Sequence, residues 1–296
     1  MYPDEFDYRE AESVDHAVEL LEAHAGEEVE LLAGGHSLLP AMKTGLSSPD
    51  VLVDIGSVDE LRGVSVDGDT LSVGASTSYS EFLDSDAAHE HAPTMTAAVA
   101  EVGDRQVRNR GTVGGNLAHA DPASDLPGAA LASDATLVLQ GPDGTRRVSA
   151  EEFFFGMYAT DVGPSELVTA VEFPSASGAI GAYEKKPSPS SGYAMVGVAV
   201  LLDVDGGGVV QSARVGANGV VGQGVSLSSV ADAIEGDRLD DDAAEHAASR
   251  ATEDVDEAMA MDDLQASGEF RLQLLEVYTE RALRSAVAAA AAPAAD

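Results

Sequence analysis

Residues 30–40 read ELLAGGHSLLP, and this stretch carries most of the information about the fold. A short apolar strand that begins at Val29 runs directly into Gly34 and Gly35. Two adjacent glycines let the backbone turn sharply and leave its N–H groups accessible, because no Cβ blocks the approach of a ligand. Successive amides of this kind form a concavity that binds anions. For a lone Gly-Gly pair, an ordinary tight turn is the alternative.

A second glycine-rich segment, GTVGGN at residues 111–116, has the same chemistry much later in the chain. Small hydroxyl residues accompany both segments, so the two loops are suited to clamp one pyrophosphate from two sides. The chain contains no GxGxxG sequence, and a Rossmann dinucleotide site therefore has no anchor. It also contains no Gly-Lys pair, which excludes a Walker A loop.

The charge balance is strongly acidic. The 296 residues contain 16 Lys and Arg against 52 Asp and Glu, a formal net charge of −36. Such a polyanion repels nucleic acid and anionic membranes, which argues against both as partners. A salt-rich cytoplasm screens this self-repulsion, since the Debye length is about 3 Å at about 1 M salt. We therefore expect a halophilic source. Arg105, Arg108 and Arg110 precede the second glycine segment, where they either neutralise a bound anion or pair with surface carboxylates.

Cysteine is absent, which excludes disulfides, thiolate metal sites, cysteine nucleophiles and an iron–sulfur cluster held by this chain. The histidines indicate no metal site: His89 and His91 lie in an acidic stretch, and His119 with Asp121 lacks a third ligand at suitable spacing. No Ser/His/Asp triad can be assigned, which suits a protein whose chemistry comes from a cofactor. Because the sequence shows neither a signal peptide nor a membrane span, we expect a soluble, cytoplasmic protein.

The apolar pattern predicts an α+β protein with two domains. The small, polar segment SASG at 175–178 is the best boundary. Before it, a helix should follow Ser13, and residues 103–125 fit no regular element. Helices are expected at 78–102, with a break at Pro93, and at 126–132. Strands are expected at 29–35, 51–55, 61–66, 70–76, 135–140, 145–148 and 166–174. After it, antiparallel strands are expected near 180–185, 193–204 and 208–217, and helices near 226–235, 240–261 and 269–291.

Several segments together resemble one family. The glycine segments extend to LLAGGHSLLPAMK and VGDRQVRNRGTVGGNLAHADPASDLP, and they occur with VLVDIG, LRGV, GYAMVGVAV and DLQASGEFRLQLLEVYTERAL. In this order they resemble, over essentially the whole chain, the FAD-binding medium subunit of molybdenum hydroxylases, a group with aerobic carbon monoxide dehydrogenase and the xanthine dehydrogenase FAD subunit. The resemblance implies a FAD-binding domain of the vanillyl-alcohol-oxidase (PCMH) type at residues 1–175. A smaller domain should follow at 178–292, with helices packed on a three-stranded antiparallel sheet.

The resemblance also implies which residues bind the cofactor. It places the two glycine loops on opposite sides of the FAD pyrophosphate and the flavin ring near an aspartate and a lysine. The implied cofactor-binding residues are Leu32, Ala33, Gly34, Gly35, His36, Ser37, Leu38, Val102, Thr112, Gly114, Gly115, Asn116, Asp125, Val168 and Lys185. Leu167 is an alternative to Val168. Lys186 is an alternative to Lys185, because the PSPSSG that follows departs from the basic run common in the family. Lys185 and Tyr193 are the candidates to face the flavin, and the resemblance assigns no catalytic residue or metal ligand.

The same resemblance implies that the chain is catalytically incomplete alone. In the family, a large subunit oxidises the substrate at a molybdenum cofactor and a small subunit carries the electrons through two [2Fe–2S] clusters. The FAD subunit passes them to a quinone, NAD or oxygen. We therefore expect three kinds of subunit, assembled as a dimer of heterotrimers. Two alternatives stay open: a stand-alone flavin-dependent reductase or oxidase of the same fold, and a scaffold subunit without flavin.

Overall fold

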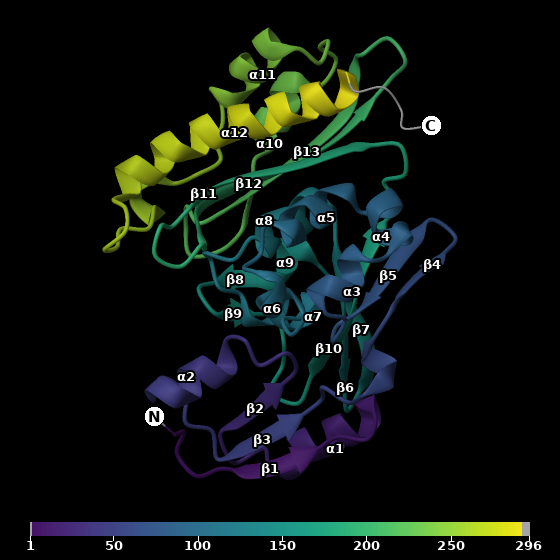
Figure 1. The fold of residues 1–296 in the computed structure, drawn as a ribbon, viewed down its shortest axis with the longest axis vertical. Coiled ribbons are helices and arrows are strands. Elements are labelled where there is room, and N and C mark those ends of the chain that lie inside the picture. Colours follow the sequence, from purple (N-terminus) through teal and green to yellow (C-terminus); the bar gives the residue numbers. More distant parts are fainter. Residues whose placement is uncertain (1, 292–296) are drawn as a thin grey trace.

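A computed structural model describes residues 2–291, and their N-terminal part is a small parallel sheet with two helices (Figure 1). The strand order is β1–β3–β2, and each crossover between parallel strands contains one helix. As predicted, the first helix begins after Ser13, whose side chain accepts a hydrogen bond from the His16 amide. The elements are β1 (Asp7–Glu10), α1 (Val14–Ala23), β2 (Val29–Leu32), α2 (Leu38–Thr44) and β3 (Val51–Asp54).

The centre of the molecule is an antiparallel sheet of five strands in the order β4–β5–β10–β6–β7. Phe82, Phe153 and Phe173 are fully buried in the core cluster that includes its apolar side chains. A register shift between Val168 and Ala170 interrupts the pairing of β10 with β6. The strands are β4 (Val64–Asp67), β5 (Thr70–Gly74), β6 (Thr136–Gly141), β7 (Gly144–Ser149) and β10 (Leu167–Pro174).

Short helices connect these strands. The helical stretch expected at 78–102 breaks at Pro93 as predicted, because Pro93 begins a new helix. It is three helices rather than two, since Ser85 caps a further one. The segment 103–125, which fitted no regular element, contains two short helices. The connecting elements are η1 (Asp59–Leu61), α3 (Tyr79–Leu83), α4 (Asp86–His91), α5 (Pro93–Ala100), α6 (Arg105–Arg108), α7 (Val113–His119), α8 (Leu126–Ala132), α9 (Ala150–Phe153), β8 (Phe154–Gly156) and β9 (Ala159–Thr160).

The C-terminal part has the expected α+β architecture with one addition. Its three long antiparallel strands were predicted, but a two-residue strand, β14, joins the edge and makes the sheet four-stranded. The helix expected at 240–261 ends at Ala248. Residue 292, the expected end of this domain, lies outside the described residues. The elements are β11 (Ile180–Pro187), β12 (Ala194–Val204), β13 (Val210–Asn218), β14 (Val225–Ser226), α10 (Ser228–Ile234), α11 (Asp241–Ala248), η2 (Glu257–Met259) and α12 (Gly268–Ala291).

The two parts of the chain pack against each other at very short range. Figure 1 shows the C-terminal sheet between α12 on one face and α5 and α8 on the other. A Cβ on Gly181 of β11 would lie 2.3 Å from the Thr94 amide nitrogen of α5, and one on Gly216 of β13 would lie 2.2 Å from the Gly128 carbonyl oxygen of α8. Only glycine fits at such distances from a backbone atom, so the sheet packs directly against the backbone of these helices.

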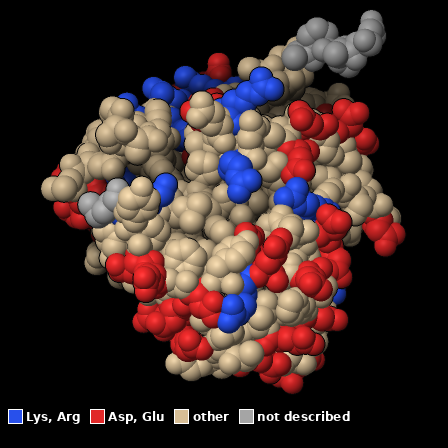
Figure 2. Space-filling view, turned by 60° about the horizontal axis from the view of Figure 1, so that its bottom comes forward, with Lys and Arg blue, Asp and Glu red and all other residues tan. Residues whose placement is uncertain are grey.

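The surface carries the charge imbalance of the sequence. On the face shown in Figure 2, acidic side chains spread over the lower and right-hand parts, whereas basic side chains gather in the upper part and around the central hollow. Exposed ion pairs such as Arg214–Asp134 contribute little stability. Because the chain has 16 Lys and Arg against 52 Asp and Glu, most carboxylates have no basic side chain to pair with. None of the helices within residues 2–291 combines the length and apolarity needed to cross a membrane.

We expect the fold to loosen in low salt. The formal net charge is −36. Because low salt lengthens the Debye screening distance, the carboxylates then repel one another more strongly. Dialysis from about 1 M to about 0.01 M KCl should lower the midpoint of thermal unfolding followed by circular dichroism. Sucrose at matched osmolality is the control, since it does not screen charge. An unchanged melting curve would contradict the halophile interpretation.

Candidate functional site

The two glycine segments lie against each other. A Cβ added to Gly34 would lie 2.0 Å from the Arg110 carbonyl oxygen and 3.1 Å from the Gly111 Cα. A Cβ added to Gly115 would lie 3.7 Å from the Ala33 Cβ. The structure thus brings together the two loops that the sequence singled out, and at Gly34 the contact is backbone against backbone.

The loops present free amides next to this contact. Within the described part of the chain, the amides of residues 34–37 and of Gly115 have no hydrogen-bond partner. Gly35 has a φ of 75°, which turns the chain toward α2. The backbone of the second loop is fixed by two hydrogen bonds, since the Val113 and Gly114 amides donate to the Thr77 and Ala75 carbonyls at 3.0 and 2.9 Å. Accessible amides on a fixed backbone are suited to bind an anion.

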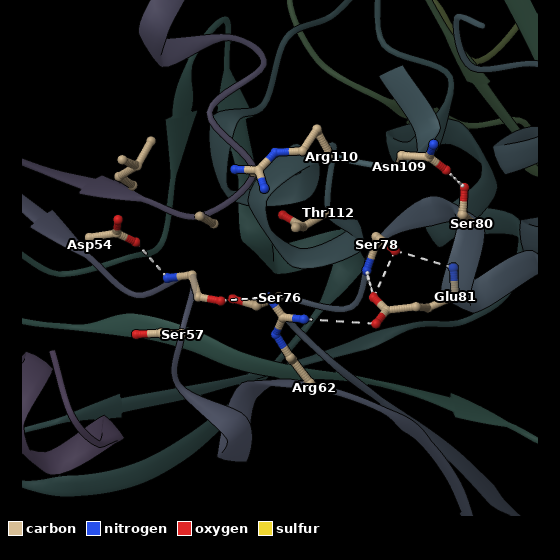
Figure 3. A pocket seen from close by; sticks show the side chains of 14 residues that line it. Asp54, Ser57, Arg62, Ser76, Ser78, Ser80, Glu81, Asn109, Arg110 and Thr112 are labelled. Carbon is tan, nitrogen blue, oxygen red and sulfur yellow. Dashed lines mark hydrogen bonds and ion pairs between the residues drawn. The ribbon is translucent and has the colours of Figure 1, made fainter. Parts of the chain in front are cut away.

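A polar cavity of about 640 Å³ opens at the junction of the loops (Figure 3), within the usual range of roughly 300–1,000 Å³ for ligand pockets. Figure 3 shows Arg110 and Thr112 above it and Arg62 below it. The Ser76 hydroxyl in its lining is buried without a partner among residues 2–291. The lining residues are Leu32, Ala33, Gly34, Asp54, Gly56, Ser57, Arg62, Ser76, Ser78, Ser80, Glu81, Asn109, Arg110 and Thr112.

Most of these lining residues were not predicted from the sequence. Four of the expected cofactor residues line the cavity, namely Leu32, Ala33, Gly34 and Thr112. Glu81 lies beside the Arg62 guanidinium at 3.8 Å and accepts hydrogen bonds from the Ser78 amide and hydroxyl at 2.8 and 2.7 Å. The hydrogen bonds to Ser78 hold the pKa of Glu81 below its usual value, so this carboxylate is ionised. The spacing S-x-x-E is a capping box and could have placed Ser78 and Glu81 at a helix start, but not at a cavity.

A second group of expected residues surrounds a buried ion pair. The Lys185 ammonium donates to an Asp125 carboxylate oxygen at 2.9 Å and to the Glu101 carbonyl at 2.8 Å, and both paired side chains are 6% exposed. Burial raises the pKa of Asp125 to about 6, although the Lys185 charge acts in the opposite direction. Lys185 comes from β11 and Asp125 immediately precedes α8, so the pair joins the two parts of the chain. Lys185, rather than Lys186, makes these contacts.

Asn116 connects the second glycine loop to this group. Its amide nitrogen donates to the Tyr79 hydroxyl at 2.8 Å, and its amide oxygen accepts from the Ser124 hydroxyl at 2.6 Å. The Tyr79 ring fills the space where Gly111 has no side chain, since a Cβ there would lie 2.5 Å from a ring carbon. Burial raises the pKa of Tyr79, so the hydroxyl stays neutral.

Three aromatic side chains, those of Tyr193, His119 and Tyr158, belong to the surroundings of the loops. The Tyr193 side chain is close enough to Ser37 for the hydroxyls to interact, although burial and the nearby Asp121 carboxylate raise the pKa of Tyr193. The rings of His119 and Tyr158 pack 5.1 Å apart. Burial lowers the pKa of His119, so the imidazole is neutral. Tyr193 remains 45% exposed and is therefore available to cover a ligand.

The other expected residues have different surroundings. The Val102 carbonyl accepts from Arg108 at 3.0 Å, Val168 pairs with Leu139 in the central sheet, and Leu167 is buried in the N-terminal core. His36 lies in the turn before Leu38, which begins α2.

The arginines before the second loop have no carboxylate partner in the described residues. Arg108 instead donates to the carbonyls of Val102 and Gly103 at 3.0 and 3.2 Å, and Arg110 lines the cavity. Pairing with surface carboxylates, the alternative interpretation of this cluster, is therefore not what residues 2–291 show. No group of three or more potential metal ligands occurs in the same part of the chain.

We expect Gly34→Ala to disrupt the site. Its Cβ would overlap a backbone carbonyl that cannot move aside, so the loops must separate, at a stability cost of about 1–3 kcal/mol. The variant should melt at a lower temperature and lose the FAD that the resemblance implies, measured as flavin absorbance after gel filtration. Gly26→Ala is the matched control, because no atom lies within 4 Å of its Cβ position. Full flavin retention by Gly34→Ala would refute the assignment of this loop.

Comparison with known proteins covers nearly the whole chain. Residues 4–176 match the family described as FAD binding domain in molybdopterin dehydrogenase, and residues 181–286 match the CO dehydrogenase flavoprotein C-terminal domain. The chain is 34% identical to the glyceraldehyde dehydrogenase medium chain of Sulfolobus acidocaldarius, over 96% of this chain and 99% of that one. It is also 34% identical to the carbon monoxide dehydrogenase medium chain of Hydrogenophaga pseudoflava, over 97% and 98%.

The fold agrees with these sequence matches. A solved carbon monoxide dehydrogenase from Hydrogenophaga pseudoflava, which lacks the Mo-pyranopterin moiety of the molybdenum cofactor, superposes with a TM-score of 0.90 at 35% identity. The match covers 97% of this chain and 99% of that chain. This chain therefore belongs to the family of FAD-binding medium subunits of molybdenum-containing dehydrogenases and hydroxylases.

Proposed function

We propose that FAD binds with its pyrophosphate across the two glycine loops of this chain. The free amides of residues 34–37 and of Gly115 supply donors, and the Thr112 hydroxyl adds another. The cavity provides a concave space beside the loops, and Arg110 supplies positive charge in a chain of net charge −36. In this proposal Leu32, Ala33, Leu38 and Gly114 complete the loops and their backbone contacts.

The flavin ring is best accommodated by the second group of residues. Lys185 uses two of its three N–H donors on Asp125 and Glu101, and the third has no partner among the described residues. Asn116 is fixed by Tyr79 and Ser124 at the end of the second loop. We assign Val102 to the same region, Tyr193 to the exposed face of the ring, and Val168 to a backbone contact with the cofactor.

Bound FAD supplies electron storage and transfer, which the side chains of this cysteine-free chain do not provide. The chain's own role is to hold the cofactor and to fix a lysine and an amide beside it. The electrons come, in this proposal, from [2Fe–2S] clusters of a small partner subunit, after substrate oxidation on a large molybdenum subunit. They leave to an external acceptor, and the assembly is a dimer of heterotrimers.

The proposal extends to domain limits and location. We place the FAD-binding domain at residues 1–175 and the C-terminal domain at 178–292, because the chain passes from the central sheet to β11 at this point. The acid-rich composition supports a salt-rich cytoplasm as the location. The relatives act on substrates as different as glyceraldehyde and carbon monoxide, as their names state, at similar identity to this chain. This supports a substrate chosen on another subunit.

Co-purification separates the proposal from a stand-alone flavoprotein. Gentle purification from the source cells in high salt should yield three polypeptides with molybdenum, iron and flavin, measured by metal analysis and absorbance. Recovery of this chain alone as an NAD(P)H-oxidising flavoprotein would support the stand-alone alternative. Recovery in the complex without flavin absorbance would support the scaffold alternative.

We further expect Arg110→Gln to weaken FAD binding in the complex. Loss of one charge-assisted hydrogen bond, worth about 1.5–3 kcal/mol, should raise the Kd for FAD by about ten- to a hundredfold. The Kd is measured by flavin fluorescence after dialysis against graded FAD concentrations. Arg238→Gln is the control, because Arg238 is in the C-terminal part and donates to the Gly207 carbonyl at 3.1 Å. Equal Kd values for both variants and the unaltered complex would contradict a role for Arg110.

A further inference from the structure

Tyr183 is a second side-chain donor to the carboxylate of the buried ion pair. It lies two residues before Lys185 on β11, so both side chains point to the same face of the strand. Its hydroxyl donates to one Asp125 oxygen at 2.6 Å, while Lys185 donates to the other at 2.9 Å. Two residues on the same face of one strand therefore hold the two oxygens of the same carboxylate.

The space for the Tyr183 hydroxyl depends on a glycine. On the neighbouring strand β12, a Cβ at Gly197 would lie 2.1 Å from the Tyr183 oxygen. The hydroxyl could not reach Asp125 past any other residue at this position. Tyr183 is 7% exposed and Asp125 is 5% exposed, so the hydrogen bond forms away from water, where it is stronger.

Asn218 of β13 lies on the far side of this hydroxyl. Its amide oxygen is 3.4 Å from the Tyr183 oxygen, and its amide nitrogen is buried without a partner in residues 2–291. The single proton of Tyr183 is already donated to Asp125, so the hydroxyl can only accept from Asn218. Exchanging the amide oxygen and nitrogen, which are assigned from the hydrogen-bond network, turns this contact into an N–H donor and supplies the nitrogen with a partner.

We propose that Tyr183, supported by Asn218, is a positioning residue that fixes the Asp125 carboxylate and through it aims the free N–H of Lys185 at the flavin. This inference rests on the proposed function. In this chain of hydrogen bonds, Asn218 donates to Tyr183 and Tyr183 donates to Asp125. Lys185 donates to the second oxygen of the same carboxylate. Because the three donors lie on β11 and β13, the C-terminal domain sets the geometry of a site whose loops belong to the other domain.

The proposal has a pH signature. Asp125 faces Tyr183 and Lys185 of β11, Glu101 at the end of α5, and the Tyr79 and Tyr193 hydroxyls. The Tyr183 hydrogen bond favours the ionised form and lowers the pKa of Asp125, which burial has raised to about 6. Without that donor the carboxyl takes up a proton at higher pH and releases Lys185. FAD binding should then weaken at a higher pH than in the unaltered complex.

The experiment compares Kd-against-pH profiles for FAD in the purified complex, for Tyr183→Phe and for Tyr278→Phe. Tyr278 is the matched control, since it is also buried in the C-terminal domain but its hydroxyl accepts from Arg281 at 3.1 Å, away from the ion pair. We expect the pH at which binding weakens to rise by about one unit in Tyr183→Phe and to stay unchanged in Tyr278→Phe. A merely structural role would raise Kd equally at every pH, and parallel profiles would overturn the proposal.

Asn218→Ala keeps the test decisive if Tyr183→Phe does not assemble. It should shift the profile in the same direction by a smaller amount, because the carboxylate keeps both direct donors. A profile that matches the unaltered complex would overturn the role of Asn218, and with it the donor chain. If the unaltered complex itself contains no flavin, the proposed function fails. If it contains flavin but Tyr183→Phe leaves the profile in place, only this inference fails.

Discussion

The site depends on the tight contact between the backbone of Gly34 and the carbonyl oxygen of Arg110. Gly34 cannot carry a side chain there, because its Cβ would lie 2.0 Å from the Arg110 carbonyl oxygen. The first loop follows β2 of the small parallel sheet. The second loop is held by hydrogen bonds from the Val113 and Gly114 amides to the carbonyls of Thr77 and Ala75. Beside this contact, the amides of residues 34–37 and of Gly115 have no hydrogen-bond partner among residues 2–291. The same contact that joins the two sheets therefore leaves a set of unsatisfied donors, which favours a bound anion.

Local patterns in the sequence were sufficient for part of this structure. The Ser13 cap, the strands of alternating or continuous apolar residues and the glycine loops are local features, and they are found where they were expected. The helices α6 and α7 were not predicted, because they are short and because glycine and polar residues dominate their sequence. The two-residue strand β14 was also not predicted, because so short a pairing is set by the neighbouring strand.

The site itself was predictable in its loops but not in its surroundings. Asp54, Arg62 and Ser76 line the cavity only because three separate segments converge on it, and no spacing in the sequence indicates this. The Lys185–Asp125 pair joins two domains across sixty positions of the sequence. The family resemblance placed each of the two residues near the flavin, whereas their pairing, its burial, the second bond of Lys185 to Glu101 and the contact with Tyr183 required coordinates.

That ion pair also limits how the chain can be recombined. The two family domains look like separable modules, each with its own sheet and core. Yet the carboxylate of Asp125 belongs to one and both of its donors to the other, and removing a partner from a buried charge is among the most destabilising changes in a protein. A chimera that takes its C-terminal domain from a distant relative would need a lysine and a hydroxyl donor at matching positions of its first strand. Replacing one domain alone would therefore break this ion pair unless both donor positions match.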